Sequence, residues 1–143
     1  MDHNKKRLFF VGGEDVSLRI PMVKMLNKLG YEVTVVGSET RQIFDQANIR
    51  YFNYSLDRGF TPLLDLKAVY QLFKLFREKR PEIVHTFDTK PNILACVASW
   101  FARVPKTIRT INGMGDIFSS KSMRIDILSR IYNLSQYLAS GLS

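Results

Sequence analysis

Polar side chains that could do chemistry follow two apolar runs in the second half of the chain. The segment 80–91, RPEIVHTFDTKP, and the segment 110–116, TINGMGD, each pass from a short strand-like pattern into polar, glycine or proline residues. In an open α/β sheet, ligands bind in the crevice beyond the carboxyl ends of the strands, while strand interiors serve packing. We therefore expect these two loops to carry the function.

Three residues of the first loop suit the chemistry of sugars and phosphates. His85, Asp88 and Lys90 can hydrogen-bond sugar hydroxyls, and the lysine can also pair with a diphosphate. A second interpretation stays open, in which the loop only caps a following helix that begins at Pro91. The residue types fit both interpretations equally well.

The turn after the first apolar run is another candidate binding region. Gly12 and Gly13 have no side chains, so backbone N–H groups at the start of the next helix could approach a phosphate, which the helix dipole attracts. Arg19 in that helix could hold a phosphate through two hydrogen bonds. Turn geometry alone would also explain the glycines, and a solvated charge would explain the arginine.

Several common activities lack their motifs in this sequence. The chain has neither the GxGxxG pattern of dinucleotide binding nor the GxxxxGK[ST] pattern of a phosphate-binding loop. His3 and His85 are its two histidines, so no zinc-type ligand set is expected, and the GxSxG elbow of serine hydrolases is missing. Asp57 lies too far into its loop to be a receiver-type phosphate acceptor. We expect no metal and no cofactor.

Alternating elements must position these residues. Apolar runs and turn signals predict strands at 8–11, 31–36, 49–54, 82–86 and 107–111, and helices at 16–29, 39–46, 62–80, 92–102 and 119–138. Five such units predict a parallel sheet covered on both faces, with right-handed crossovers. Apolar residues recur at helical spacing in the first helix, at Leu18, Met22, Met25, Leu26 and Leu29. One face of the third helix holds Leu66, Val69, Tyr70, Phe73 and Phe76.

Length indicates the number of domains, and net charge indicates the kind of partner. A chain of 143 residues predicts one domain, spanning 1–143, with a real core. The net charge is +8, and residues 60–143 hold 12 basic and 6 acidic side chains. This excess favours an anionic partner, although solvated helix faces would produce the same count. Nucleic acid is not expected, because no recognition module is identifiable.

The compartment follows from the cysteine and from hydropathy. Cys96 is the single cysteine and lies in an apolar run, which predicts a small core residue in a reducing compartment. No run approaches the roughly 20 apolar residues of a spanning helix, and the amino terminus lacks a signal-peptide core. We expect a cytoplasmic protein that could be peripheral on the inner membrane.

One basic helix bears on that membrane contact. Between residues 67 and 80, lysines and arginines alternate with Leu72, Phe73 and Phe76, a pattern that suits an anionic lipid surface. The alternative is a stripe that faces the core, with a solvated basic back. Both interpretations predict a helix here.

The joint order of KLGYEV, LKAVYQLFKLFREKRPEIVH, TKP and INGMG resembles the amino-terminal half of bacterial GT-B glycosyltransferases of the family 4 type, which build capsule, lipopolysaccharide and other cell-surface polysaccharides. The resemblance implies a Rossmann-like, doubly wound sheet of strand order 3-2-1-4-5. It also implies a retaining enzyme whose first domain binds a polyprenyl-diphosphate-linked or saccharide acceptor. The nucleotide-sugar donor is held mainly by a second domain, absent here, so the chain alone should be inactive.

The same resemblance draws attention to Asn112, which would lie near the reaction centre. Many relatives carry histidine there, whereas asparagine can hydrogen-bond but cannot transfer a proton near neutral pH. In retaining chemistry the leaving phosphate can take the acceptor proton, so the catalytic residue stays unknown. Gly113 and Gly115 would let the backbone pass close to a sugar, and Asp116 could accept a hydroxyl or cap a helix.

The sequence leaves two origins for such a half-enzyme. The chain could be a fragment or a truncated reading frame, or it could be one subunit of a split glycosyltransferase. A different class of function also remains, namely a noncatalytic subunit that tethers a partner glycosyltransferase to the membrane or to its acceptor. The excess of basic residues in the second half motivates that alternative.

Overall fold

The computed structural model, which describes residues 5–59 and 61–110, is built on a five-stranded parallel sheet. Its strand order is β3-β2-β1-β4-β5, as the family resemblance implied. The order reverses between β1 and β4, which makes the gap beyond their carboxyl ends the switch point of the sheet. The strands are β1 (Arg7–Val11), β2 (Glu32–Gly37), β3 (Arg50–Asn53), β4 (Ile83–Phe87) and β5 (Lys106–Thr110).

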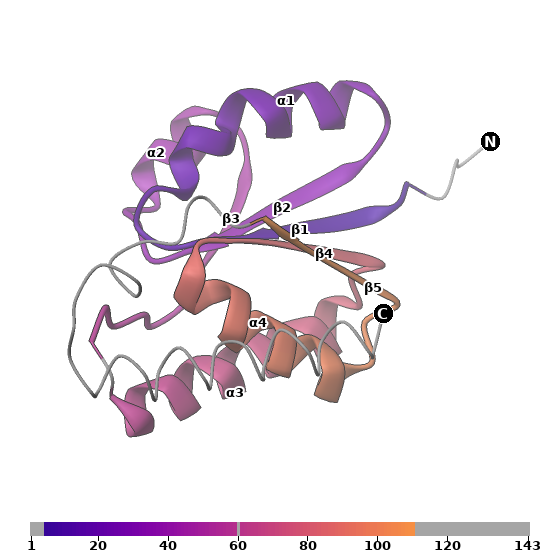
Figure 1. Ribbon diagram of the computed structural model, residues 1–143. Coiled ribbons are helices and arrows are strands. Elements are labelled where there is room, and N and C mark those ends of the chain that lie inside the picture. Colours follow the sequence, from indigo (N-terminus) through magenta and orange to yellow (C-terminus); the bar gives the residue numbers. More distant parts are fainter. Residues whose placement is uncertain (1–4, 60, 111–143) are drawn as a thin grey trace.

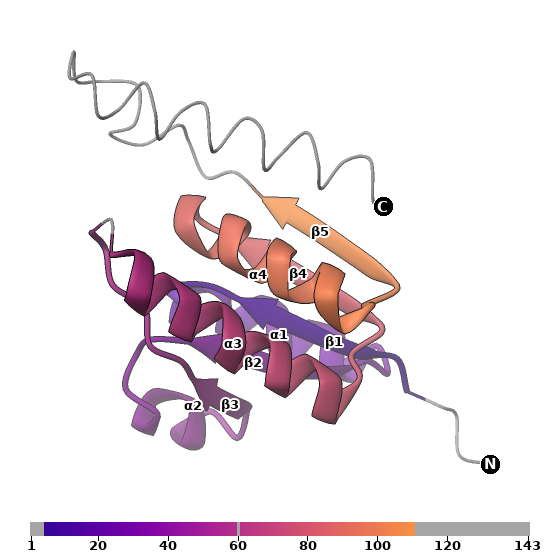
Figure 2. The same ribbon diagram turned by 90° about the horizontal axis from the view of Figure 1, so that it is seen from below.

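Helices cover both faces of the sheet, as Figures 1 and 2 show. The first face carries α1 (Ile20–Lys28) and α2 (Gln42–Gln46), and the second carries α3 (Pro62–Lys79) and α4 (Thr89–Ala102). The helix predicted from residue 16 begins as a 3-10 turn, η1 (Val16–Arg19), and Pro21 then stands in the first turn of α1. The helix predicted at 119–138 lies outside the described residues.

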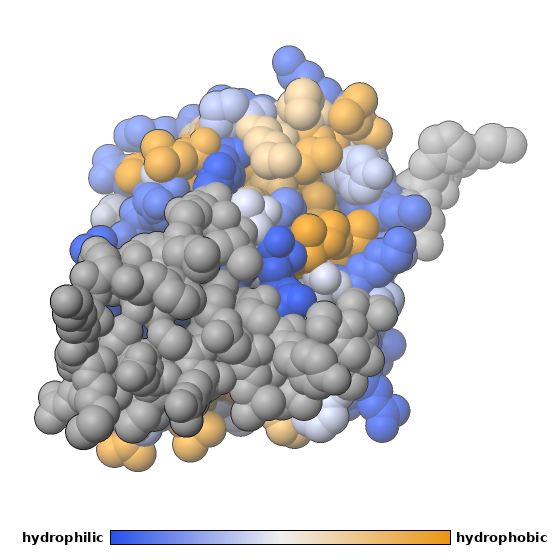
Figure 3. All heavy atoms as spheres, in the orientation of Figure 1, coloured by the Kyte–Doolittle hydropathy of each residue, from blue (hydrophilic) through white to orange (hydrophobic). Residues whose placement is uncertain are grey.

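The core under α1 and α2 is rich in aromatic rings. Phe44 stacks on Tyr51 with ring centroids 4.1 Å apart, and Phe10 and Val23 are fully buried beside them. Most of the apolar residues that recur at helical spacing here are exposed, and α1 reaches the core through Val23. Figure 3 shows apolar side chains on the surface over α1 and α2. The exposed residues of this recurring set are Leu18, Met22, Met25 and Leu29, while Leu26 is partly buried.

The core under α3 and α4 uses small residues where the two helices meet. Ala68, Leu72 and Phe76 are the buried positions of α3, spaced four apart, and Phe76 meets Phe9 edge to face at 6.0 Å. The expected stripe of α3 was therefore shifted, because the seam with α4 runs through Ala68. Of that stripe, Phe76 is buried, Val69 and Phe73 are partly buried, and Leu66 and Tyr70 are exposed. The core interpretation is confirmed for Leu72 and Phe76.

The helix α4 is fastened to two strands by a buried amide. Thr86 of β4 donates a hydrogen bond to the side-chain oxygen of Asn92, and the Asn92 nitrogen donates to the Thr110 carbonyl of β5 at 3.1 Å. Asn92 is fully buried, so these bonds satisfy an amide that would otherwise be costly to desolvate. Cys96 is buried on the same helix, and its burial raises the pKa of the thiol to about 11.

Candidate functional site

The turns after β1 and β4 lie side by side at the switch point. Gly12 and Gly13 follow β1, and Asp88 follows β4. A Cβ atom at Gly13 would lie 3.9 Å from the Asp88 carboxylate oxygen Oδ2, so the two turns are neighbours. The structure therefore brings these three predicted site residues together at the carboxyl edge, where open α/β sheets bind ligands.

Close packing explains the first glycine. A Cβ atom at Gly12 would lie 2.8 Å from Cγ2 of Val16, which is closer than real Cβ contacts come. The Gly12 amide donates to the Val36 carbonyl at 2.9 Å and so extends the pairing of β1 with β2. At Gly13 the same atom would lie 3.3 Å from Leu56, a looser contact. Tight packing thus requires Gly12, while Gly13 faces the loop after β3 and Asp88.

The helix start after these glycines already has an anionic partner. The Ser17 amide donates to a carboxylate oxygen of Glu39 at 2.7 Å. Glu14 and Asp15 are exposed beside it, so the local charge is negative. The expected approach of a phosphate to this helix start would need Glu39 to leave the Ser17 amide, because like charges repel at that distance.

Asp88 holds an unusual backbone conformation. Its φ is +70° and its ψ is 160°, a combination that residues with a side chain rarely adopt. It is the N-cap of α4, and its carbonyl accepts the Asn92 amide at 3.0 Å, but its side chain makes no capping hydrogen bond. The helix therefore begins at Thr89 rather than at Pro91, and the capping interpretation holds for the backbone of Asp88 alone.

Tyr54, which the sequence did not single out, ties the loop after β3 to the first turn. Its hydroxyl donates to the Gly12 carbonyl at 3.0 Å, and the ring is buried. Burial raises the pKa of Tyr54 strongly, and the negative charge of Asp88 raises it further. The hydroxyl is therefore a fixed, neutral donor at physiological pH.

The ammonium group of Lys90 is held by three oxygen atoms. It pairs with the Asp65 carboxylate of α3 at 2.6 Å and donates to the Asp57 carbonyl at 2.5 Å. It also donates to the carbonyl of Gly59. The Lys90 and Asp65 side chains keep only 22% and 19% of their exposure, so this ion pair is largely shielded from water. Nothing in the sequence indicated Asp65 as its partner.

His85 lies within β4 rather than in the loop after it, and it comes near Arg19 on the face of the sheet that carries α1. The His85 ring stacks on Phe87 at 4.3 Å, and its Nε2 atom lies 2.7 Å from the Thr110 hydroxyl oxygen. The Arg19 guanidinium lies over the Phe87 ring, 4.6 Å from its centroid. Burial lowers the pKa of His85, and the positive charge of Arg19 lowers it further. The imidazole is therefore neutral at pH 7 and suited to hydrogen bonding.

The remaining predicted site residues lie outside the described part of the chain. These are Asn112, Gly113, Gly115 and the weaker candidate Asp116. The last described residue is Thr110, at the end of β5 next to Phe87 of β4. Their roles remain predictions.

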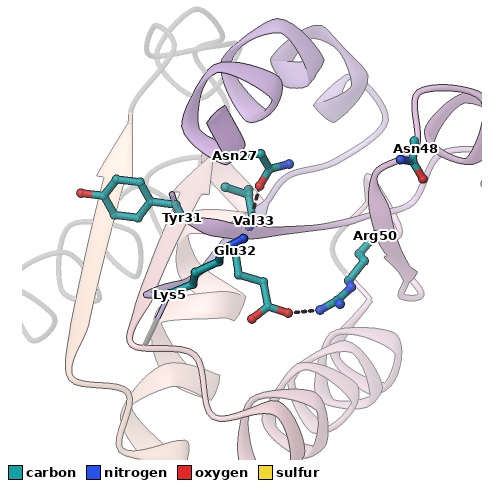
Figure 4. Close-up of a pocket in the computed structure, with 7 residues that line it drawn as sticks. All are labelled: Lys5, Asn27, Tyr31, Glu32, Val33, Asn48 and Arg50. Carbon is teal, nitrogen blue, oxygen red and sulfur yellow. Dashed lines mark hydrogen bonds and ion pairs between the residues drawn. The ribbon is translucent and has the colours of Figure 1, made fainter. Parts of the chain in front are cut away.

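Two hollows lie at the opposite, amino-terminal edge of the sheet. The first has a volume of about 410 Å³, and Figure 4 shows that Glu32 pairs with Arg50 across it while Asn27 accepts the Val33 amide. The second, of about 310 Å³, lies between the ends of α3 and α4 and is lined by Arg7, Arg77, Arg80 and Arg103 among others. No group of acidic, histidine or cysteine side chains within residues 5–59 and 61–110 could hold a metal ion.

A comparison with protein families assigns the chain to a family. A model of the family described as "Glycosyl transferase 4-like" matches residues 7–140, almost the whole chain. The chain therefore belongs to the glycosyl transferase 4-like family. Of the matched residues, the structure describes 7–59 and 61–110.

Individual relatives agree with this family. The chain is 28% identical over 90 residues to the UDP-Gal:alpha-D-GlcNAc-diphosphoundecaprenol alpha-1,3-galactosyltransferase of Escherichia coli, covering 63% of this chain and 22% of that enzyme. It is 32% identical over 108 residues to an undecaprenol-diphosphate N-acetylglucosamine transferase of Clostridium botulinum, strain 657, covering 63% of this chain and 30% of the relative. The chain thus spans less than a third of the length of these relatives.

A solved structure supports the fold. The glycosyltransferase SnogD of Streptomyces nogalater superimposes with a TM-score of 0.58 at 16% identity, and the match covers 98% of this chain and 42% of that protein. At this identity the likeness establishes the Rossmann-like fold of the chain. It assigns no substrate.

Proposed function

We propose that this chain is the acceptor-binding half of a glycosyltransferase that moves a sugar from a nucleotide sugar to a polyprenyl-diphosphate-linked or other saccharide acceptor in cell-surface polysaccharide synthesis. The observation that carries the proposal is the family match over residues 7–140, which includes both turns of the switch point. Two relatives named for undecaprenol-diphosphate substrates support the acceptor class. A second domain, outside this sequence, holds the base and ribose of the donor.

In the proposed acceptor site, three side chains near the carboxyl edge of the sheet contact the acceptor. Neutral His85 and the Asp88 carboxylate hydrogen-bond sugar hydroxyls, and Arg19 meets a phosphate, because these groups offer the required donors, acceptors and charge. Chemistry then proceeds without a histidine base, since the leaving phosphate takes the proton of the acceptor hydroxyl. The residues that form the site are Gly12, Gly13, Arg19, His85, Asp88, Lys90, Asn112, Gly113 and Gly115.

Reconstitution tests this proposal. The chain is joined to a donor-binding half, in cis or in trans, and sugar transfer to a lipid-diphosphate acceptor is followed. Transfer is expected only when both halves are present. Arg19→Ala should lower transfer, whereas the matched variant Arg41→Ala, an exposed arginine paired with Asp45 on α2, should not. A folded complex that transfers no sugar from any nucleotide-sugar donor contradicts the proposal.

The division of ligands between the halves gives a second test. The isolated chain should bind nucleotide sugars with a Kd no better than roughly millimolar, about 4 kcal/mol, and binding should weaken with salt because it depends on phosphate. Amide shift mapping with a nucleotide sugar and with a prenyl diphosphate measures both. Tight, base-specific binding of the nucleotide would show that the two halves have been assigned the wrong way round.

A membrane contact is the second candidate, and one surface favours it. Leu63, Leu66 and Tyr70 are exposed by 83%, 67% and 63% along the first half of α3, with Lys67 among them. Apolar side chains beside a lysine suit the interface of an anionic bilayer. This surface would hold the protein peripherally at the cytoplasmic side of the inner membrane, either as an enzyme or as a noncatalytic tether. None of the described helices is long and apolar enough to cross a bilayer.

Vesicle co-sedimentation separates these possibilities. Binding to phosphatidylglycerol vesicles should exceed binding to phosphatidylcholine vesicles and should fall with salt. Replacing Leu63 and Leu66 by serine should reduce it, while Leu29→Ser, a matched exposed leucine beyond the end of α1, should not. Binding that ignores lipid charge and salt argues against the tether. Vesicle binding without any sugar transfer in the reconstitution favours it.

A further inference from the structure

The contacts of Lys90 account for every donor that it has. An ammonium group carries three N–H donors, and here they meet the Asp65 carboxylate and the carbonyls of Asp57 and Gly59. A phosphate bound directly by Lys90 would have to displace one of these oxygen atoms. The lysine is therefore already engaged in the folded chain.

Asp57 and Gly59 belong to the loop between β3 and α3, and that loop lies against the first turn of the site. Leu56 would be 3.3 Å from a Cβ atom at Gly13, and Tyr54 donates to the Gly12 carbonyl. The Ser55 amide donates to the Gln71 side chain at 2.9 Å, which fixes the start of the loop. The segment 55–59 thus contacts both Lys90 of α4 and the Gly12-Gly13 turn.

The Lys90–Asp65 ion pair is more buried than the Arg58–Glu14 ion pair, which also involves this loop. Arg58 pairs with Glu14 of the first turn, but their side chains are 80% and 52% exposed, so water screens that pair. Lys90 and Asp65 are shielded, and removing one partner would leave a charge with little solvation. Lys90 is therefore the contact whose loss should matter most to the loop.

We infer that Lys90 is a positioning residue, which fixes segment 55–59 against the Gly12-Gly13 turn and thereby shapes the acceptor site, rather than a group that binds the diphosphate itself. This inference rests on the proposed function for the identity of the site. The attachment of the loop rests on contacts within the chain alone. The two parts can therefore be tested separately.

The first experiment uses the full 143-residue chain without ligand and measures ¹⁵N order parameters of the backbone. Lys90→Met should lower the order parameters of residues 55–59 from the rigid range near 0.85 to below about 0.6, and those of β1 and β2 should stay unchanged. The matched control is Lys67→Met on α3, an exposed lysine that should leave the loop rigid.

A double variant covers the case in which Lys90→Met fails to fold. Combining it with Asp65→Leu removes the carboxylate that would otherwise be left unpaired, so the folded state should recover. The loop should remain loose, because the Asp57 and Gly59 carbonyls still lack their donor. Recovery of the loop together with the fold would overturn the inference, since Asp65 alone would then explain the effect.

Ligand titration supplies the opposing outcome. If Lys90→Met leaves segment 55–59 rigid but abolishes the amide shifts caused by inorganic pyrophosphate, then Lys90 binds phosphate directly and the inference is wrong. In the reconstituted enzyme the variant should raise the KM for acceptor by about tenfold or more, with a smaller change in kcat. Failure of every reconstitution would count against the proposed function, while the order parameters would still decide the role of Lys90.

Discussion

The two edges of the sheet are built differently. At the carboxyl edge the loops interlock: Leu56 lies against Gly13, Tyr54 bonds to Gly12, and Lys90 holds the segment between them. At the amino edge the helix ends stand apart and leave hollows of about 410 and 310 Å³. These hollows lie at the amino edge, whereas in open α/β sheets ligands bind beyond the carboxyl ends of the strands, at the switch point of the strand order.

The two edges also differ in the backbone conformation of their residues with positive φ. Arg80 and Arg103 have positive φ, but each ends a helix in the left-handed conformation that commonly closes α-helices. Asp88 has φ +70° with ψ 160°, which is not a helix ending. Residues held in such sparsely populated regions cluster at functional sites. The unexplained strain therefore lies at the carboxyl edge.

The largest effect is expected from filling the first turn. Gly12→Ala should reduce the free energy of unfolding by about 3 kcal/mol, because its methyl group would overlap buried Val16. Urea denaturation measures the loss. The variant Gly30→Ala at the amino edge is the matched comparison, since Gly30 has φ +95° but no atom within 4 Å of an added Cβ. Its cost should be nearer about 1 to 2 kcal/mol, from the backbone alone. Equal losses would contradict the difference between the edges.

The strain at Asp88 gives the next effect. Asp88→Ala and Asp88→Gly both remove the carboxylate, so the difference between them reports the backbone. The glycine variant should be more stable by about 1 to 2 kcal/mol, because only glycine adopts this conformation without strain. Thermal unfolding of both variants checks this. Equal stability would mean that the turn relaxes freely and stores no strain.

At the amino edge, a glycine substitution at a helix end should change the free energy of unfolding in the opposite direction to a glycine substitution inside the helix. Arg80→Gly should stabilise the chain by about 0.5 to 1 kcal/mol, because glycine reaches the left-handed helix ending without a side-chain penalty. Arg77→Gly, one turn earlier in α3, should instead destabilise it by about 1 kcal/mol. Urea midpoints of the two variants test the contrast. Destabilisation by both would remove the special status of the helix end.

The smallest effect concerns His85, whose ring is only half-buried. Because its pKa is lowered in the folded chain, the unfolded chain takes up a proton first as pH falls. Stability should therefore be complete above the ordinary histidine pKa of about 6.5 and should decline as pH drops through the lowered folded value. His85→Gln should flatten this part of the curve of unfolding free energy against pH. An unchanged slope in the variant would assign the pH dependence to other groups.

The parallel sheet could be predicted because strands alternate with helices along the sequence, whereas its strand order followed only from the family resemblance. Inner faces of helices were harder to predict. Periodicity gave α1 several apolar positions, and the chain buries Val23 rather than Leu18 or Met25. A short helix with apolar residues on more than one side contains no signal for which side faces the sheet. The neighbouring elements decide that.

The candidate site was predictable in its location and less so in its contacts. Sequence order placed Gly12, Gly13 and Asp88 at strand ends, and the parallel pairing of β1 with β4 brings those ends together. Tyr54 and Asp65 were missed because their partners lie more than 20 positions away in the chain. The one sequence signal that bore on Asp65 was Thr61-Pro62, which predicts a helix start and so puts Asp65 in the first turn of α3. Tertiary hydrogen bonds of this kind leave no local pattern.

The rate at which a reagent labels the buried thiol of Cys96 can report local opening of the folded chain. A thiol reagent reacts with the thiolate, and burial together with a pKa of about 11 keeps the native cysteine almost wholly protonated and covered. Since the chain has a single cysteine, the rate of labelling by excess reagent reports how often this buried thiol becomes accessible. The labelling rates of all the variants above can therefore be compared without introducing another cysteine.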